Sequence, residues 1–195
     1  MAALNRVCVY CASSSRCDPA YYDVAARLGR LLALSGVIIV YGGGKVGSMG
    51  ALADGALAAG GRVIGVLPRF MDDLEWGHGR LSELILVNDL HERKRLMIQE
   101  VDAVVALPGG CGTWEELFEA MSWKRLGLYC GPIVIVNTAG FYDPMLAQLE
   151  RSIEQRFMDE RHRAMWTVVA EPEQVLEAIR KSPAWKPENR SFSVP

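Results

Sequence analysis

Short apolar runs alternate with segments of helical periodicity along most of the chain. Each run is nearly continuous in hydrophobicity, as in parallel strands that are covered on both faces. The seven runs span residues 6–11, 37–41, 62–67, 84–87, 101–107, 132–137 and 165–169. Strands that alternate with helices predict an α/β fold, with a doubly wound parallel (Rossmann-like) sheet and helices on both faces.

Three Xaa-Pro pairs mark the expected starts of helices. At the first pair, Asp18 offers an N-cap side chain and the following proline suits the first helical position. This helix should run to about Ser35, because Gly36 favours a helix stop. The same start signal recurs at residues 143–144 and 171–172.

Length and composition fit one compact domain. The chain has 195 residues, of which 50% are hydrophobic and 23% are charged, so it can bury a core and is unlike disordered sequences. We expect residues 1–181 to form a single domain. Residues 182–195 hold three prolines and show no periodicity, and we expect them to form a loose C-terminal arm.

Charge and cysteine content indicate which binding partners and which cellular compartment to expect. The formal net charge of −2 predicts no broad basic surface for a nucleic acid polymer. No apolar run approaches the ~20 residues that span a membrane, and residues 1–10 read as a short strand rather than a signal peptide. The five cysteines, an odd number, indicate reduced thiols and predict a cytoplasmic protein.

Cys8 and Cys11 form a Cys-x-x-Cys pair, a pattern that also occurs in zinc and redox sites. Here the pair lies in a strand-like run, where positions three apart point to opposite faces of the sheet. No second cysteine or histidine pair has zinc spacing. We therefore expect neither a metal site nor a disulfide at this position.

Residues 41–50 (Tyr-Gly-Gly-Gly-Lys-Val-Gly-Ser-Met-Gly) contain the pattern Gly-x-Gly-x-x-Gly. An NAD site needs an acidic residue near the end of the next strand, and the first acid there is Asp72. A Walker A loop needs serine or threonine after the lysine, where this chain has valine. Amides at a helix N-terminus can still bind an anion, so Gly43 and Gly44 are candidates for a phosphate loop. A tight packing turn between strand and helix is the alternative.

A second glycine-rich turn, Pro-Gly-Gly-Cys-Gly-Thr at residues 108–113, joins an apolar strand to a helix. Consecutive flexible residues can form a nest of backbone amides, which attracts anions. The hydroxyl group of Thr113 and the positive end of the helix dipole would add to this attraction. The turn therefore predicts a phosphate site.

Glu116 lies one turn into the helix that follows. A spacing of ~100° per residue places it beside Glu119, Trp123 and Leu126. The other face carries the apolar side chains of Trp114, Leu117, Phe118, Met121 and Leu128. Glu116 either lines a ligand pocket or subunit contact, or is a solvated acid that stabilises the helix N-terminus.

Three cations occupy the first turns of another helix, whose sequence is Asp89-Leu-His-Glu-Arg-Lys-Arg95. Asp89 is the expected N-cap, with Glu92 completing a variant of the capping box. The positive end of the helix dipole disfavours cations here, so helix stability does not explain them, whereas an anionic ligand would. For Lys94 the alternative is a solvated face along which its aliphatic stem lies.

The two motifs together, His-Glu-Arg-Lys and Pro-Gly-Gly-x-Gly-Thr-x-x-Glu, resemble those of the Lonely Guy (LOG) family, often labelled lysine-decarboxylase-like. The resemblance covers roughly residues 6–179. It includes Tyr-Cys-Ala-Ser-Ser at residues 10–14, Ala-Asp-Gly-Ala at residues 53–56 and Ser-Trp at residues 122–123. Characterised members of this family are cytokinin nucleotide phosphoribohydrolases.

The resemblance implies an arginine–glutamate catalytic pair, which maps onto Arg93 and Glu116. The substrate-binding positions of the family map onto Glu75, Lys94, Gly110, Cys111, Gly112, Thr113, Trp114, Glu115 and Ser122. Two positions depart from the pattern: Cys111 stands where relatives often have an aromatic residue, and Trp114 is bulkier than the usual aliphatic residue. Both substitutions bear on the shape of the pocket and on the preferred base.

The activity implied by the resemblance is hydrolysis of the N-glycosidic bond of AMP or an N6-substituted AMP, giving the free base and ribose 5-phosphate. No cofactor and no metal are expected. Glu116 would stabilise an oxocarbenium-like state and position water. Arg93 would bind the phosphate or polarise the departing base.

Other functions remain open. A non-catalytic nucleotide or cofactor carrier on the same fold would need the glycine loops but not Arg93 and Glu116 together. A pyridoxal-phosphate decarboxylase needs a buried Schiff-base lysine with a partner acid for the pyridine nitrogen, and none of the five lysines has a clear one. We also expect a homodimer, because Trp123 and Leu126 form a second apolar face beside Glu116.

Overall fold

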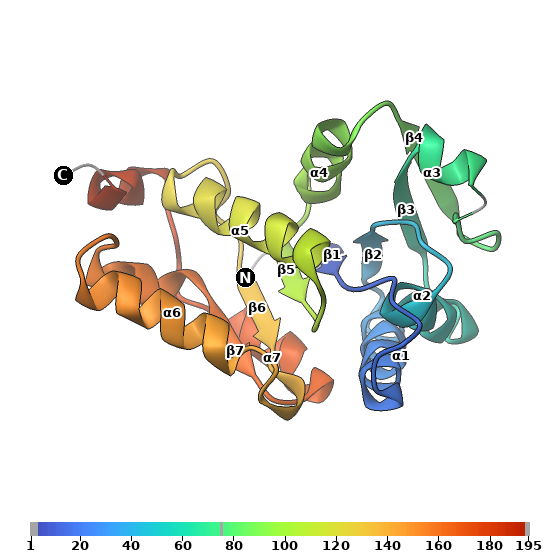
Figure 1. Ribbon diagram of the computed structural model, residues 1–195, viewed down its shortest axis with the longest axis horizontal. Coiled ribbons are helices and arrows are strands. Elements are labelled where there is room, and N and C mark those ends of the chain that lie inside the picture. Colours follow the sequence, from blue (N-terminus) through green and yellow to red (C-terminus); the bar gives the residue numbers. More distant parts are fainter. Residues whose placement is uncertain (1–3, 75, 194–195) are drawn as a thin grey trace.

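The computed structural model describes residues 4–74 and 76–193. Its centre is a sheet of seven strands in the order β4-β3-β2-β1-β5-β6-β7, and each neighbouring pair is parallel. In Figure 1, β3 and β4 lie toward one end of the molecule, and β6 and β7 lie on the other side of β1. The strands are β1 (Arg6–Tyr10), β2 (Ile38–Tyr41), β3 (Val63–Pro68), β4 (Glu83–Val87), β5 (Ala103–Ala106), β6 (Ile133–Val136) and β7 (Thr167–Val169).

Helices connect the strands in sequence. The α-helices are α1 (Pro19–Leu34), α2 (Gly47–Ala58), α3 (Arg69–Asp73), α4 (Leu90–Ile98), α5 (Cys111–Arg125), α6 (Asp143–Glu154) and α7 (Val175–Lys181). Short 3-10 helices form at η1 (Thr138–Gly140), η2 (Glu160–Met165), η3 (Pro172–Gln174) and η4 (Pro187–Ser193). The predicted α/β fold with a doubly wound parallel sheet is confirmed.

Alternate residues of the strands point to opposite faces of the sheet and pack in two separate hydrophobic cores. Val9 of β1 packs in a cluster with side chains of α1, α2 and α7. Its neighbour Tyr10 packs in a second cluster with side chains of α4, α5 and α6. Cys8 belongs to the second cluster and Cys11 to the first, so the two thiols point to opposite faces as expected, and both cysteines are free. Both faces of the sheet are therefore covered by helices.

The expected helix starts hold at the first and third Xaa-Pro pairs and are shifted at the second. The Asp18 carboxylate accepts a hydrogen bond from the Ala20 amide at 2.9 Å, and Gly36 adopts a φ of 73° after the helix. At the second signal the N-cap is Tyr142, because the Asp143 carboxylate instead accepts a bond from the side-chain amide of Asn137. The third signal opens the 3-10 turn η3 before α7.

Residues 182–193, the described part of the segment after α7, pack on the body of the protein. The expectation of a loose arm is wrong for these residues. Trp185 is only 6% exposed, and its indole N–H donates to the Lys124 carbonyl at 2.7 Å. Figure 1 shows this red segment beside the C-terminal end of α5. A buried indole removes a large apolar area from water, which a search for periodicity does not detect.

All seven strands end at the same edge of the sheet, because they are parallel. The direction of the strand order reverses between β1 and β5, and ligands of such sheets bind in the crevice at this switch point. The loop after β2 contains the first glycine motif, and the loop after β5 contains the second. The topology therefore brings both predicted phosphate loops to one edge, on either side of β1. In the described residues, no helix is long and apolar enough to cross a membrane.

Candidate active site

Arg93 is buried at the centre of this edge. It lies on the first turn of α4. The N-cap of this helix is Asp89, whose carboxylate accepts a bond from the Glu92 amide at 2.8 Å. The Arg93 side chain is almost fully buried, and its Nε donates to the Val66 carbonyl of β3 at 3.1 Å. Its Nη2 donates to the Gly42 carbonyl at 2.9 Å. Two backbone carbonyls thus fix the plane of the guanidinium.

Gly42 must lack a side chain for this arrangement to exist. A Cβ atom at position 42 would overlap the guanidinium of Arg93 and crowd the end of Met49. The first glycine loop therefore leaves room for the side chain of Arg93, which belongs to a different helix, α4. The glycine motif alone did not indicate this role. The neighbouring Gly43 has a φ of 78°, a conformation that favours glycine.

Glu116 lies on α5 opposite Arg93. Its side chain is about as buried as that of Arg93, and its Oε1 lies 3.9 Å from Arg93 Nη1. Burial raises the pKa of Glu116 to about 7, and the Arg93 guanidinium opposes this shift. The alternative of a solvated acid is therefore wrong. A carboxyl group with a pKa near 7 can both accept and return a proton at neutral pH.

The two predicted faces of α5 are partly exchanged. The buried residues of this helix are Thr113, Glu116, Leu117, Ala120, Met121 and Lys124, whereas Trp114 and Phe118 are exposed. A charged side chain can face the interior where a polar partner meets it. The buried Lys124 ammonium, for example, donates to the Gly131 carbonyl at 2.7 Å. Hydropathy alone cannot detect such compensation.

Lys94 joins α4 to α5. Its ammonium lies 2.6 Å from Glu115 Oε1 and 3.0 Å from Glu119 Oε2, and its side chain is buried. The alternative of a solvated lysine is therefore wrong. Lys94 and Glu115, which were both predicted to bind substrate, therefore pair with each other. Each is the direct sequence neighbour of one member of the Arg93–Glu116 pair.

The Pro-Gly-Gly turn leads directly into α5. Gly110 is the N-cap, with φ −91° and ψ −158°, and it has no side-chain cap. This extended backbone is not the left-handed conformation that a nest uses, so the predicted amide nest does not form at Gly110. What the turn offers to an anion is the first amides of the helix and the positive end of its dipole. Thr113 is buried under the turn, while Cys111 and Gly112 are exposed.

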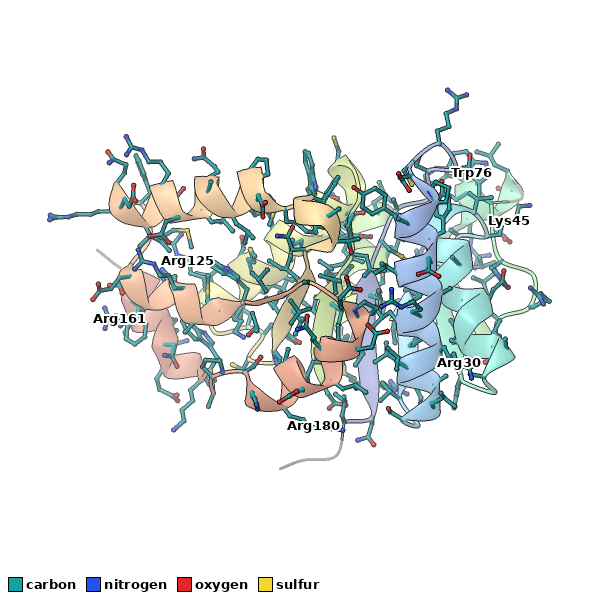
Figure 2. The ribbon with its side chains drawn as sticks, turned by 90° about the horizontal axis from the view of Figure 1, so that it is seen from below. Arg30, Lys45, Trp76, Arg125, Arg161 and Arg180 are labelled. Carbon is teal, nitrogen blue, oxygen red and sulfur yellow. The ribbon has the colours of Figure 1, made fainter. Side chains whose placement is uncertain are left out.

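Two cavities flank these elements. One, of about 340 Å³, touches Arg93 and Gly44, and its walls are mostly apolar side chains: Val46, Met49, Leu67, Met71 and Trp76. Figure 2 shows Trp76 and Lys45, a further lining residue, at the same end of the molecule. The other, of about 320 Å³, touches Gly109, Gly110 and Trp114 and is closed by Tyr21 and Phe141. A larger cavity of about 760 Å³ lies at the far end of α5, by Arg125.

The remaining predicted residues are spread more widely. Ser122 is exposed, and its hydroxyl donates to the Phe118 carbonyl within α5 at 2.7 Å. Glu75 lies outside the described residues. Within the described ranges, no group of three or more His, Cys, Asp or Glu side chains is placed to hold a metal ion.

Sequence reasoning missed several residues that shape the site. Met49, Met71 and Trp76 line the cavity beside Arg93, and Tyr142 donates its hydroxyl proton to the Leu107 carbonyl at the start of the Pro-Gly-Gly turn. Met49 lies inside the first glycine motif, so that motif offered a signal for it. Met71 and Trp76 follow β3 and Tyr142 follows β6, and only the topology brings these segments to the site.

Comparison with known proteins shows the family of this chain. A family model described as "Possible lysine decarboxylase" matches residues 49–179. The cytokinin riboside 5'-monophosphate phosphoribohydrolase of Rhodococcoides fascians is 40% identical over 175 residues, which is 89% of this chain and 88% of that protein. The cytokinin riboside 5'-monophosphate phosphoribohydrolase LOG5 of Arabidopsis thaliana is 38% identical over 185 residues, which is 95% of this chain and 80% of that protein. The chain belongs to the LOG family.

Structural likeness extends to proteins with other names. The molybdenum cofactor carrier protein of Chlamydomonas reinhardtii superposes with a TM-score of 0.69, at 22% identity, over 91% of this chain and 96% of that chain. At this identity the likeness shows a shared fold alone. Function within the LOG fold must therefore be argued from the Arg93–Glu116 site.

Proposed function

We propose that this LOG-family protein hydrolyses the N-glycosidic bond of AMP or an N6-substituted AMP, releasing the free base and ribose 5-phosphate. The observation that carries the proposal is the buried pair of Arg93 and Glu116, 3.9 Å apart, at the switch point of the sheet. The names of the relatives at 38–40% identity support the same reaction.

Glu116 has the properties that this reaction needs. When the bond between C1′ and the base nitrogen breaks, the electron pair leaves with the base and positive charge develops on the ribose. An ionised Glu116 stabilises that charge and accepts a proton from the water that adds to C1′. The departing base takes up one proton, so Glu116 can return the proton it received. A pKa of about 7 suits both steps.

The first turn of α5 is our proposed phosphate site. The amides of Cys111 and Gly112 lie at the positive end of a 15-residue helix, and the N-cap Gly110 supplies no side chain to block them. Glu116 is little more than one helical turn from these amides. A phosphate held here orients the ribose against the carboxyl group, so binding energy away from the reacting bond serves catalysis.

The 340 Å³ cavity is our proposed site for the base. It adjoins Arg93, and its walls include Met49, Met71 and Trp76. An apolar wall of this size fits a purine that carries a hydrophobic N6 substituent better than it fits a polar one. We therefore expect isopentenyl-AMP to be hydrolysed with a higher kcat/KM than AMP.

Base release decides between hydrolase and carrier. The protein is incubated separately with AMP, isopentenyl-AMP, GMP and CMP, and base and ribose 5-phosphate are measured by chromatography. We expect equimolar base and ribose 5-phosphate from the adenine nucleotides. A Glu116→Gln variant, which keeps the shape of the side chain, should bind nucleotide but release base at least ~10²-fold more slowly. Binding without release by the wild-type protein would make it a carrier.

A further inference from the structure

A buried histidine lies behind the first glycine loop. The His78 imidazole is only 6% exposed; its Nε2 lies 3.1 Å from Asp54 Oδ1, and its Nδ1 accepts a bond from the Arg80 amide at 3.2 Å. Because Nδ1 is an acceptor, the ring proton lies on Nε2 and is donated to the carboxylate of Asp54. The Arg80 guanidinium pairs with the same carboxylate. These contacts fix the ring orientation.

The backbone around His78 is paired with the glycine loop. The His78 amide donates to the Gly43 carbonyl at 2.9 Å, and the Lys45 amide donates to the Trp76 carbonyl at 3.0 Å. Between them, Gly44 and Gly77 form an antiparallel bridge. The loop and residues 76–78 thus form a short two-stranded ribbon.

Asp54 anchors this ribbon to the helix that the loop itself begins. It lies on α2, which starts at Gly47, directly after the loop. Through Asp54, the imidazole ties the returning segment to α2. The side-chain contacts therefore brace a ribbon that has only a few backbone bonds of its own.

The ribbon meets the proposed active site at two places. The Gly42 carbonyl, next to Gly43, accepts the bond from Arg93 Nη2. Gly44, Lys45 and Trp76 line the cavity that we assign to the base. A shift of the ribbon would thus move the guanidinium and one wall of the cavity together.

We propose that His78, oriented by Asp54, is a positioning residue that holds residues 42–45 where the Gly42 carbonyl orients Arg93. The effect on turnover rests on the proposed hydrolase function. The effect on the loop does not, and the two can be measured separately. His78 acts through the loop, while Arg93 and Glu116 remain the groups that meet the substrate.

The kinetic test compares two buried histidines. His162 is fully buried, and its Nδ1 accepts a bond from the Asp159 amide at 3.0 Å, so His162→Gln is a matched control. Its neighbour Arg161 lies at the opposite end of the molecule from Trp76 (Figure 2). His78→Ala should lower kcat for isopentenyl-AMP at least ~10-fold, because small displacements of positioned groups are costly. His78→Gln, whose amide can still donate to Asp54, should recover part of that loss, and His162→Gln should keep kcat near the wild-type value.

Hydrogen exchange tests the loop without any turnover. The Lys45 amide is bonded to the Trp76 carbonyl, so its exchange reports whether the ribbon is intact. His78→Ala should speed this exchange at least ~10-fold relative to both the wild type and His162→Gln. Unchanged exchange of Lys45, or equal losses of kcat in His78→Ala and His162→Gln, would overturn the proposal. If the wild-type protein releases no base, the proposed function fails while the exchange result still decides the role of His78.

Discussion

The guanidinium of Arg93 and the carboxyl group of Glu116 face each other across 3.9 Å, and both side chains are buried. This distance is too long for a hydrogen bond. Arg93 directs its Nε and Nη2 to two backbone carbonyls instead. The arginine therefore offsets the burial of Glu116 only in part, which accounts for a carboxyl pKa of about 7.

This raised pKa makes Glu116 a source of pH-dependent instability. The folded pKa of about 7 lies above the ordinary value of 4.5, so the folded protein holds the proton more tightly than the unfolded chain does. The resulting stabilisation is complete below pH 4.5 and is lost as the pH rises through 7. Above that range the ionised carboxyl group lowers the free energy of unfolding by up to ~3 kcal/mol relative to acid pH.

Glu116→Gln should remove this dependence. The neutral amide cannot ionise, so the variant should be more stable than the wild type at pH 8 and nearly equal to it at pH 4, below the ordinary pKa of the carboxyl group. Urea unfolding at the two pH values measures the difference, and Glu119→Gln on the same helix is the control. A gap between wild type and Glu116→Gln that does not widen with pH would contradict the assigned pKa.

Lysine should not be able to replace Arg93 in the reaction, although it keeps the positive charge. Lysine carries a single ammonium group, which cannot reach the carbonyls of Gly42 and Val66 and the Glu116 carboxyl group together. We expect turnover of isopentenyl-AMP to fall at least ~10²-fold in both Arg93→Lys and Arg93→Ala. Circular dichroism and the thermal midpoint show whether the fold is retained. Near-wild-type turnover in Arg93→Lys would mean that charge alone is needed at this position.

The strands and helices could be predicted from local sequence patterns, whereas the packing of the site could not. Apolar runs and capping residues such as Asp18 and Asp89 are local signals, and the strands and helices followed from them. Arg93 and Glu116 came from a family resemblance, because their meeting depends on how α4 and α5 cross the sheet. The burial of Glu116 could not be read from hydropathy, since its partners lie on other elements. Trp185 was missed for the same reason: its partner, the Lys124 carbonyl, is 61 residues away in the chain.

Cys111 should be the thiol that alkylating reagents reach first. It is exposed at the first position of α5, whereas Cys8 and Cys11 are buried in the two cores. Because we place the substrate phosphate at the amides beside it, AMP should slow its modification. Mass spectrometry of peptides after brief treatment with iodoacetamide, with and without AMP, gives the site and the protection. Equal labelling of Cys111 under both conditions would count against a phosphate site at this turn.

A homodimer remains our expectation, and the structure changes the best residue for testing it. Trp123, the obvious choice from the sequence, is partly buried against the core of its own chain, so a charge there would damage the fold. Leu126 and Leu128 at the end of α5 are 51% and 70% exposed. Apolar side chains grouped in this way are typical of a subunit contact, and an isologous dimer is the commonest way to cover them.

Leu128→Glu should therefore split the dimer without unfolding the protomer. A charge buried without a partner in a contact costs several kcal/mol, whereas in an isolated protomer it stays in water. Light scattering at micromolar concentration should give about two chains for the wild type and one for the variant. Leu34→Glu, at a leucine that is 63% exposed on α1, is the matched control and should leave the mass unchanged. A wild-type mass of one chain would rule out the dimer, and a monomeric Leu128→Glu with full base release would show that each protomer carries a complete active site.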